Sequence, residues 1–171
     1  MGNERRKDTK LRYSEYYGMQ KVYDNLYQKS VEKQNFNSLM KVVTSDDNIL
    51  LAYRNIKRNG GSTTAGVDGK TIKDIEKLNT AEFLGIVKKR FAKYIPRKVR
   101  RVEMPKPNGK TRPLGIPSIC DRIEQQCILQ TLEPICEARG KPHSHGFRPN
   151  RSAQHDSADC AKKMNNIKMH Y

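Results

Sequence analysis

The chain has 171 residues, of which 34 are Lys or Arg and 18 are Asp or Glu, and its formal net charge is +16. A surplus of this size points to a polyanionic partner, either nucleic acid or an anionic membrane. No apolar run approaches the length of a membrane-spanning helix, and the first ten residues contain no signal-peptide core. We therefore expect a cytoplasmic protein that binds nucleic acid and no membrane.

The cysteines do not indicate a metal site. Cys120, Cys127, Cys136 and Cys160 form no Cys-x-x-Cys pair, and closed zinc sites usually show such tight spacings. We expect free thiols in a reducing compartment and no metal bound by this chain.

The first 57 residues predict a helical N-terminal extension (1–57). From Tyr13 onward, apolar residues recur at helical spacing. The tyrosines of this first helix could stack on bases or pack against the core, and both roles stay open. A second helix is expected to carry Leu39 and Val43. The run 44–47, Thr-Ser-Asp-Asp, predicts the cap and acidic first turn of a third helix, not the carboxylate pair of a polymerase.

Residues 58–80 predict a glycine-rich loop followed by a short helix. The loop, 58–70, lacks the glycine spacing of a phosphate-binding P-loop. Thr71 is expected to cap the short helix, which carries Ile75 and Leu78.

A longer helix is expected to start at a cap on Thr80 and to end before Pro96. Its inward face is predicted to carry Phe83, Ile86, Val87, Phe91 and Tyr94. Its outward face is predicted to carry four basic residues, Lys88, Lys89, Arg90 and Lys93.

Residues 99–117 predict a β-hairpin. Asn108-Gly109 between two extended runs is a strong turn signal, because both residue types tolerate positive φ. Pro105 and Pro113 lack the N–H that a central strand needs, so the hairpin should lie at an edge or protrude. Basic residues dominate it and the approach to it: Arg97, Lys98, Arg100, Arg101, Lys106, Lys110 and Arg112.

After the hairpin, Ser118 and Asp121 predict a capped helix start. The helix is expected to bury Ile123, Cys127, Ile128 and Leu132. Pro134 either kinks this helix or begins another. Gly140 suggests looser packing, and a last helix is expected over 153–165.

Three blocks occur in order: AGVDG at 65–69, VRRVEMPKPNGKTRPLGIP at 99–117 and HGFRPNRSA at 145–153. Together they resemble the reverse transcriptases encoded by group II introns. The resemblance implies an α+β fold, mostly helical with a short antiparallel hairpin, that forms the fingers subdomain of a right-hand polymerase. Residues 81–171 would be the fingers, and the chain would end before the palm, by nature or by design.

The resemblance also implies site residues. Lys106 and Arg112 match the family positions that grip the triphosphate of an incoming dNTP, where a point charge and a bidentate fork suit phosphate. Arg100 and Ile116 are candidates for holding the templating base. Phe147 is expected in the core. The other expected template or RNA contacts are Lys88, Lys89, Arg90, Lys93, Arg97, Lys98, Arg101, Arg148, Asn150, Arg151, Gly66 and Asp68.

The family's chemistry uses two Mg²⁺ ions held by aspartates of the palm. Those aspartates are not expected in this chain, so it supplies no catalytic residue and should not polymerise alone. The parent is expected to be an RNA-directed DNA polymerase with a maturase role in splicing, acting with intron RNA, template RNA and dNTP. The alternatives are a non-catalytic, RNA-binding maturase fragment and a split enzyme completed in trans; whether the chain forms a homodimer stays open.

Overall fold

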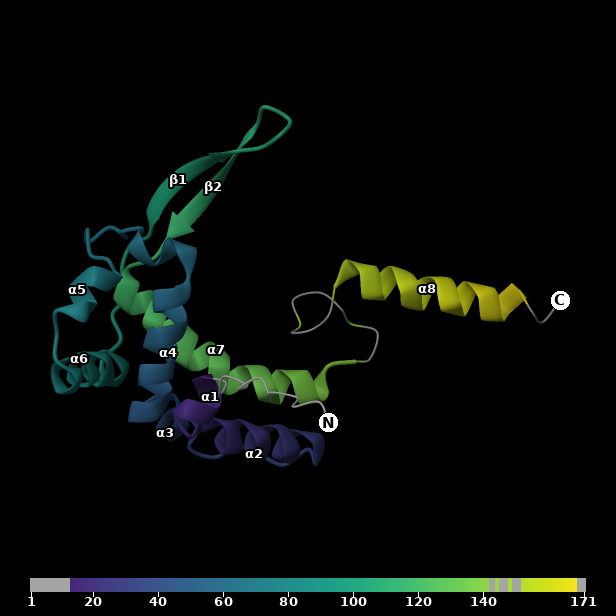
Figure 1. Cartoon of the computed structure of the whole chain (residues 1–171), viewed down its shortest axis with the longest axis horizontal. Helices are drawn as coiled ribbons and strands as arrows, with labels where there is room; N and C mark the ends of the chain where they lie inside the picture. The colour runs from purple at the N-terminus through teal and green to yellow at the C-terminus, as the bar shows by residue number, and fades with distance from the viewer. Residues whose placement is uncertain (1–12, 142–143, 145–147, 149–151, 169–171) are drawn as a thin grey trace, which may run out of the picture.

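The structure is a computed structural model, and it describes residues 13–141, 144, 148 and 152–168. It is mostly helical with a small antiparallel sheet, so the α+β fold class is confirmed (Figure 1). In chain order the elements are α1 (Tyr13–Tyr16), α2 (Met19–Val31), α3 (Leu39–Val43), α4 (Asp46–Arg58), η1 (Gly60–Thr63), α5 (Ile72–Glu76), α6 (Thr80–Ala92), β1 (Arg100–Pro105), β2 (Thr111–Ile116), α7 (Ile119–Arg139) and α8 (Ala153–Lys168).

Helix α7 is the centre of the body. It packs along α2 and α4 and contacts α3 and α6, so elements that are distant in the sequence surround one helix (Figure 1). Burying these apolar side chains supplies the main driving force for folding. The buried core cluster comprises Val43, Ile49, Ala52, Ile56, Ile72, Ile75, Phe83, Val87, Ile119, Ile123 and Cys127.

Several helix boundaries follow the local signals. Ser118 caps α7 by accepting from the backbone N–H of Asp121, and Thr71 forms a capping box with Asp74, as expected. The cap of α6 is Asn79, paired with Glu82, and the prediction of Thr80 is wrong. The reason is that Asn79 offers an equivalent cap one residue earlier, with an acidic partner at the right spacing. Helix α7 runs without a break through Pro134.

Four predictions of buried residues are wrong. Ile86 of α6 is exposed, and so are Ile128 and Leu132 of α7. Tyr94 is also exposed, because α6 ends at Ala92, before this residue. The helical spacing was correct, but α6 and α7 each bury a narrower face than the sequence pattern suggested. Phe147, expected in the core, lies outside the described residues.

The hairpin projects from the body as a two-stranded arm (Figure 1). β1 pairs antiparallel with β2, from Arg100 opposite Ile116 to Pro105 opposite Thr111. At the tip the Gly109 N–H donates to the carbonyl of Lys106 at 3.1 Å, and the Lys106 N–H donates to the carbonyl of Lys110 at 2.7 Å. Only Gly109 of the Asn-Gly pair has positive φ, at 75°. The connection is therefore a three-residue loop with a glycine bulge.

A buried amide joins four helices. Asn48 is fully buried, and its Nδ2 donates to the carbonyls of Val43 at 2.9 Å and Cys127 at 3.1 Å. Its Oδ1 accepts from the Tyr23 hydroxyl at 2.8 Å and from Gln130 Nε2 at 2.6 Å. Because buried polar groups are costly when unpaired, this network fixes α2, α3, α4 and α7 in one arrangement. Burial also raises the pKa of the Tyr23 hydroxyl and keeps it a donor.

Helix α8 stands apart from the body in Figure 1. It covers 153–168, three residues beyond the expected end. None of the helices described is both long and apolar enough to span a bilayer.

We predict that Asn48→Ala lowers the free energy of unfolding by about 2–3 kcal/mol, because it leaves several buried groups without partners. Urea unfolding measures the change. The control is Asn25→Ala at an exposed position of α2, which should shift stability by less than about 0.5 kcal/mol. Equal effects of the two substitutions would contradict the role of Asn48.

Candidate nucleic-acid interface

The hairpin has two distinct faces. Paired residues of an antiparallel ladder share a face, and successive residues alternate. One face therefore carries Arg100, Val102 and Met104 of β1 with their partners Ile116, Leu114 and Arg112 of β2. Its apolar side chains lie between two arginines, and Met104 and Leu114 are 39% and 42% exposed. This face combines apolar contact area with positive charge at each end.

The opposite face and the tip differ in how their charges are paired. Arg101 Nε lies 2.9 Å from Glu103 Oε1 on the second face, so its charge is partly neutralised. Within the part of the chain that the structure describes, Arg100, Lys106, Lys110 and Arg112 make no ion pair. Unpaired cations on an exposed arm are available to phosphate at no cost in broken contacts.

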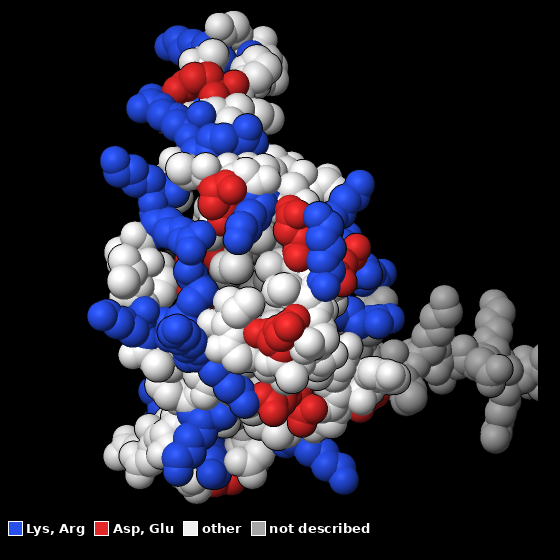
Figure 2. Space-filling view, turned by 90° about the vertical axis from the view of Figure 1, so that its left-hand side faces the viewer, with Lys and Arg blue, Asp and Glu red and all other residues white. Residues whose placement is uncertain are grey.

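The basic surface continues from the hairpin toward α6. Figure 2 shows blue side chains running from the projecting hairpin down one side of the body. Lys89, Lys93 and Lys98 are exposed and have no ion-pair partner among the described residues. Lys88 lies 2.5 Å from Asp46, and Arg97 lies 2.9 Å from Asp68.

Arg90 does not belong to this surface, and its predicted place on the outward face of α6 is wrong. Its side chain is only 16% exposed and bonds both Asp121 and Glu124 of α7. The hydrogen bond to Glu124 is the main cause that raises the pKa of Arg90. The two carboxylates are almost fully buried, and pairing with the positive charge of Arg90 offsets the cost of their burial. This contact anchors α6 to α7 just below the hairpin.

A second arginine holds the glycine-rich loop in place. Arg122 of α7 donates to the carbonyls of Pro117 at 3.2 Å and Gly61 at 2.7 Å, and also bonds the carbonyl of Thr64. Gly66 of that loop lies so close to α7 that an added Cβ would come within 2.7 Å of Ser118 Cα. The loop is thus fastened at the base of the hairpin. Partial burial lowers the pKa of Arg122.

Sequence reasoning missed Arg122, although one signal was present. A cation in the first turn of a helix opposes the helix dipole, so its presence there suggests that it serves another contact.

Asp68 and Gly66, both predicted RNA contacts, lie in this loop. Asp68 accepts from the Lys70 N–H and pairs with Arg97. The ion pair connects the loop to the segment that leads into β1. The structure therefore gives both residues a part in positioning the hairpin base.

Arg148 is described, and its neighbours Asn150 and Arg151 lie outside the described residues. Its guanidinium pairs with Glu137 at 2.5 Å and donates to the carbonyls of Lys141 at 2.6 Å and Ser144 at 3.1 Å. It also covers Gly140, where an added Cβ would lie 2.5 Å from the Arg148 Cζ. Packing at Gly140 is therefore tight, and the expectation of looser packing is wrong.

Within the described ranges, no three or more His, Cys, Asp or Glu side chains are grouped so that they could hold a metal ion. Burial raises the pKa of the Cys127 thiol to about 12, which keeps it neutral in the core.

Comparison with known proteins identifies the family. The chain is 40% identical to protein YkfC of Escherichia coli over 119 residues, which is 68% of this chain and 31% of that protein. It is 35% identical to the group II intron-encoded protein LtrA of Lactococcus lactis over 123 residues, 68% of this chain and 19% of LtrA. It is 33% identical to the putative COX1/OXI3 intron 1 protein of Saccharomyces cerevisiae over 138 residues, 78% of this chain and 15% of that protein.

The chain belongs to the group II intron-encoded proteins, the family that its three sequence blocks resemble. It spans less than a third of the length of each of these relatives. No model of a known protein family matches it.

Replacing two neighbouring cations of α6, Arg90 and Lys89, should have different effects on the free energy of unfolding. Arg90→Met leaves two buried carboxylates unpaired, and we predict a loss of about 3 kcal/mol in the free energy of unfolding. Lys89→Met removes one exposed, unpaired charge and should change the free energy of unfolding of the unsubstituted chain by less than about 0.5 kcal/mol. Thermal and urea unfolding of both variants test this contrast. A stable Arg90→Met protein would show that the buried cluster is not structurally required.

Proposed function

We propose that this chain is the part of a group II intron reverse transcriptase and maturase that handles its nucleic-acid and nucleotide substrates. The observation that supports the proposal is the projecting hairpin with four exposed, unpaired cations, Arg100, Lys106, Lys110 and Arg112, continuous with Lys89, Lys93 and Lys98. The parent activity proposed is RNA-directed DNA synthesis, with intron RNA and template RNA as partners.

The proposed contacts divide by chemistry. Lys89, Lys93, Lys98, Lys110 and Arg101 would contact RNA phosphates, which position the chain without reading sequence. Arg100 and Ile116 are cross-strand partners, so one guanidinium and one apolar side chain could hold a templating base between them. Lys106 and Arg112 would bind the triphosphate of the dNTP, as a point charge and a bidentate fork.

Arg112 shares its hairpin face with Arg100 and Ile116, whereas Lys106 lies at the tip. A triphosphate bound by both residues would therefore lie beside the base-holding face and reach toward the turn. The described residues offer no cluster of carboxylates suited to Mg²⁺. We therefore assign no metal ligand to the described residues.

The role of the hairpin in RNA binding is tested with charge-matched variants. Replacing Lys98, Arg101 and Lys110 together by Gln should weaken binding to a group II intron RNA and reduce the slope of log K against log salt by about 2. The control replaces Lys57, Lys73 and Lys77 by Gln, which removes the same charge from α4 and the neighbourhood of α5. Lys57 and Lys77 already pair with Glu76 and Asp74. Equal losses in both triple variants would mean that the hairpin has no special role.

The dNTP assignment is tested in the full-length enzyme. Lys106→Ala and Arg112→Ala should each raise the KM for dNTP by about 10-fold or more, since each removes a charge-assisted contact worth about 1.5–3 kcal/mol. Binding of template RNA should change by less than about threefold, because one phosphate contact is a small part of a wide interface. Equal losses in dNTP use and RNA binding would overturn the triphosphate assignment.

A further inference from the structure

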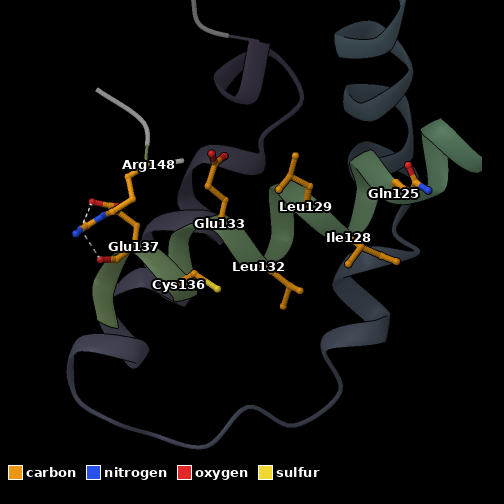
Figure 3. Close-up of a pocket in the computed structure, with 8 residues that line it drawn as sticks. All are labelled: Gln125, Ile128, Leu129, Leu132, Glu133, Cys136, Glu137 and Arg148. Carbon is orange, nitrogen blue, oxygen red and sulfur yellow. Dashed lines mark hydrogen bonds and ion pairs between the residues drawn. The ribbon is translucent and has the colours of Figure 1, made fainter. Parts of the chain in front are cut away.

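Helix α7 carries an apolar stripe that no described element covers. Ile128, Leu129 and Leu132 are 40%, 54% and 39% exposed, although they lie on the central helix of the body. With Gln125 and Cys136 they line an open groove of about 470 Å³. Figure 3 shows their side chains projecting from successive turns of α7, with the Arg148–Glu137 pair at one end. A contiguous apolar surface of this kind marks a contact site.

Helix α8 carries a second stripe, made of small and mostly apolar side chains. Ala153, Ser157, Cys160, Ala161 and Met164 share one face at helical spacing, and all five are exposed. Met164 alone is 63% exposed. An isolated helix of 16 residues is only marginally stable in water, so α8 needs a surface on which to pack.

The two stripes have the same spacing when one is read backwards. From Gln125 through Ile128, Leu129 and Leu132 to Cys136, the intervals are 3, 1, 3 and 4 residues. From Met164 through Ala161, Cys160 and Ser157 to Ala153, the intervals are again 3, 1, 3 and 4. Antiparallel packing therefore places each stripe residue of α7 opposite one of α8.

The sizes of the paired side chains are also complementary. In this register the large Ile128, Leu129 and Leu132 meet the small Ala161, Cys160 and Ser157. Large residues facing small ones let two helices approach closely and interdigitate without voids.

The chain is anchored at the end of the groove where an antiparallel helix would begin. Arg148 is fixed to Glu137 and to carbonyls at the carboxyl end of α7. Only residues 149–152 separate it from the first residue of α8, and five Cα–Cα steps span at most roughly 17 Å. The start of α8 is thus held within reach of Cys136.

From these matches we infer that the groove of α7 is the docking site of α8 of the same chain, which would leave the separate position that it has in Figure 1 and pack antiparallel to α7 as a helical hairpin. Leu129 then packs on Cys160, and Leu132 packs on Ser157. Lys162 lies on the opposite face of α8 and stays in solvent.

Disulfide trapping in the whole chain tests this register. Leu129→Cys is made with Cys136→Ser, so that the new thiol can pair with the native Cys160. Both changed positions are exposed, so the fold should be retained, and urea unfolding of the reduced protein checks it. The matched control carries Leu129→Cys, Cys136→Ser, Cys160→Ser and Lys162→Cys, which moves the α8 thiol to the outer face.

Under a mild copper–phenanthroline oxidant and at low protein concentration, we expect an intramolecular 129–160 disulfide, identified by peptide mapping. It should form at least about fivefold faster than the 129–162 disulfide of the control. Equal rates in the two proteins would mean that the tethered helix collides at random, and would overturn the inference. A disulfide between two chains, growing with protein concentration, would mean that a second copy occupies the groove, and would overturn it as well.

Discussion

The body depends on a buried ion cluster that joins α6 to α7. Asp121 and Glu124 lie in the first turns of α7, almost completely out of water, and Arg90 supplies their compensating charge. A buried carboxylate without a partner is costly, so the cluster tolerates little displacement of either helix. The hairpin joins these same two helices, and its base is therefore fixed by the same contact. Arg122 adds to this by holding the glycine-rich loop against the start of α7.

The C-terminal half of α7 is fixed by hydrogen bonds between neutral groups. Asn48 and Gln130 connect it to α4, and Ser30 of α2 donates to the carbonyl of Ile135 at 2.8 Å. One helix is thus tied to its surroundings by ions near the hairpin and by amides and hydroxyls further along. The cationic arm is thus carried by a well-packed support, which suits the proposed contacts with phosphates.

Turns and helix caps could be predicted from the sequence, because they depend on residues close together in the chain. Asn108-Gly109, the bracketing prolines, Ser118 with Asp121, and Thr71 with Asp74 act within a few residues, and each element they predict is present. Arg90, Arg122 and Asn48 could not be assigned in this way, because their partners come from distant segments and only the fold brings them together. Arg90 looked like its neighbours Lys88 and Lys89 by spacing, and only the buried carboxylates opposite distinguish it. The sequence blocks identified the family, and the relatives confirm it. The division into 1–57, 58–80 and 81–171 stays a prediction, as do the nucleotide and template contacts and the cytoplasmic location.

The central claim is that the projecting hairpin and the α6 surface together bind RNA. Hydrogen–deuterium exchange of the whole chain, with and without a group II intron RNA at moderate salt, tests this most directly. We predict slower exchange in β1, β2 and the turn at 106–110, with a smaller effect in α6, and little change in α2. Protection confined to α2 and α3, or no protection in the hairpin at an RNA concentration that saturates binding, would contradict the account.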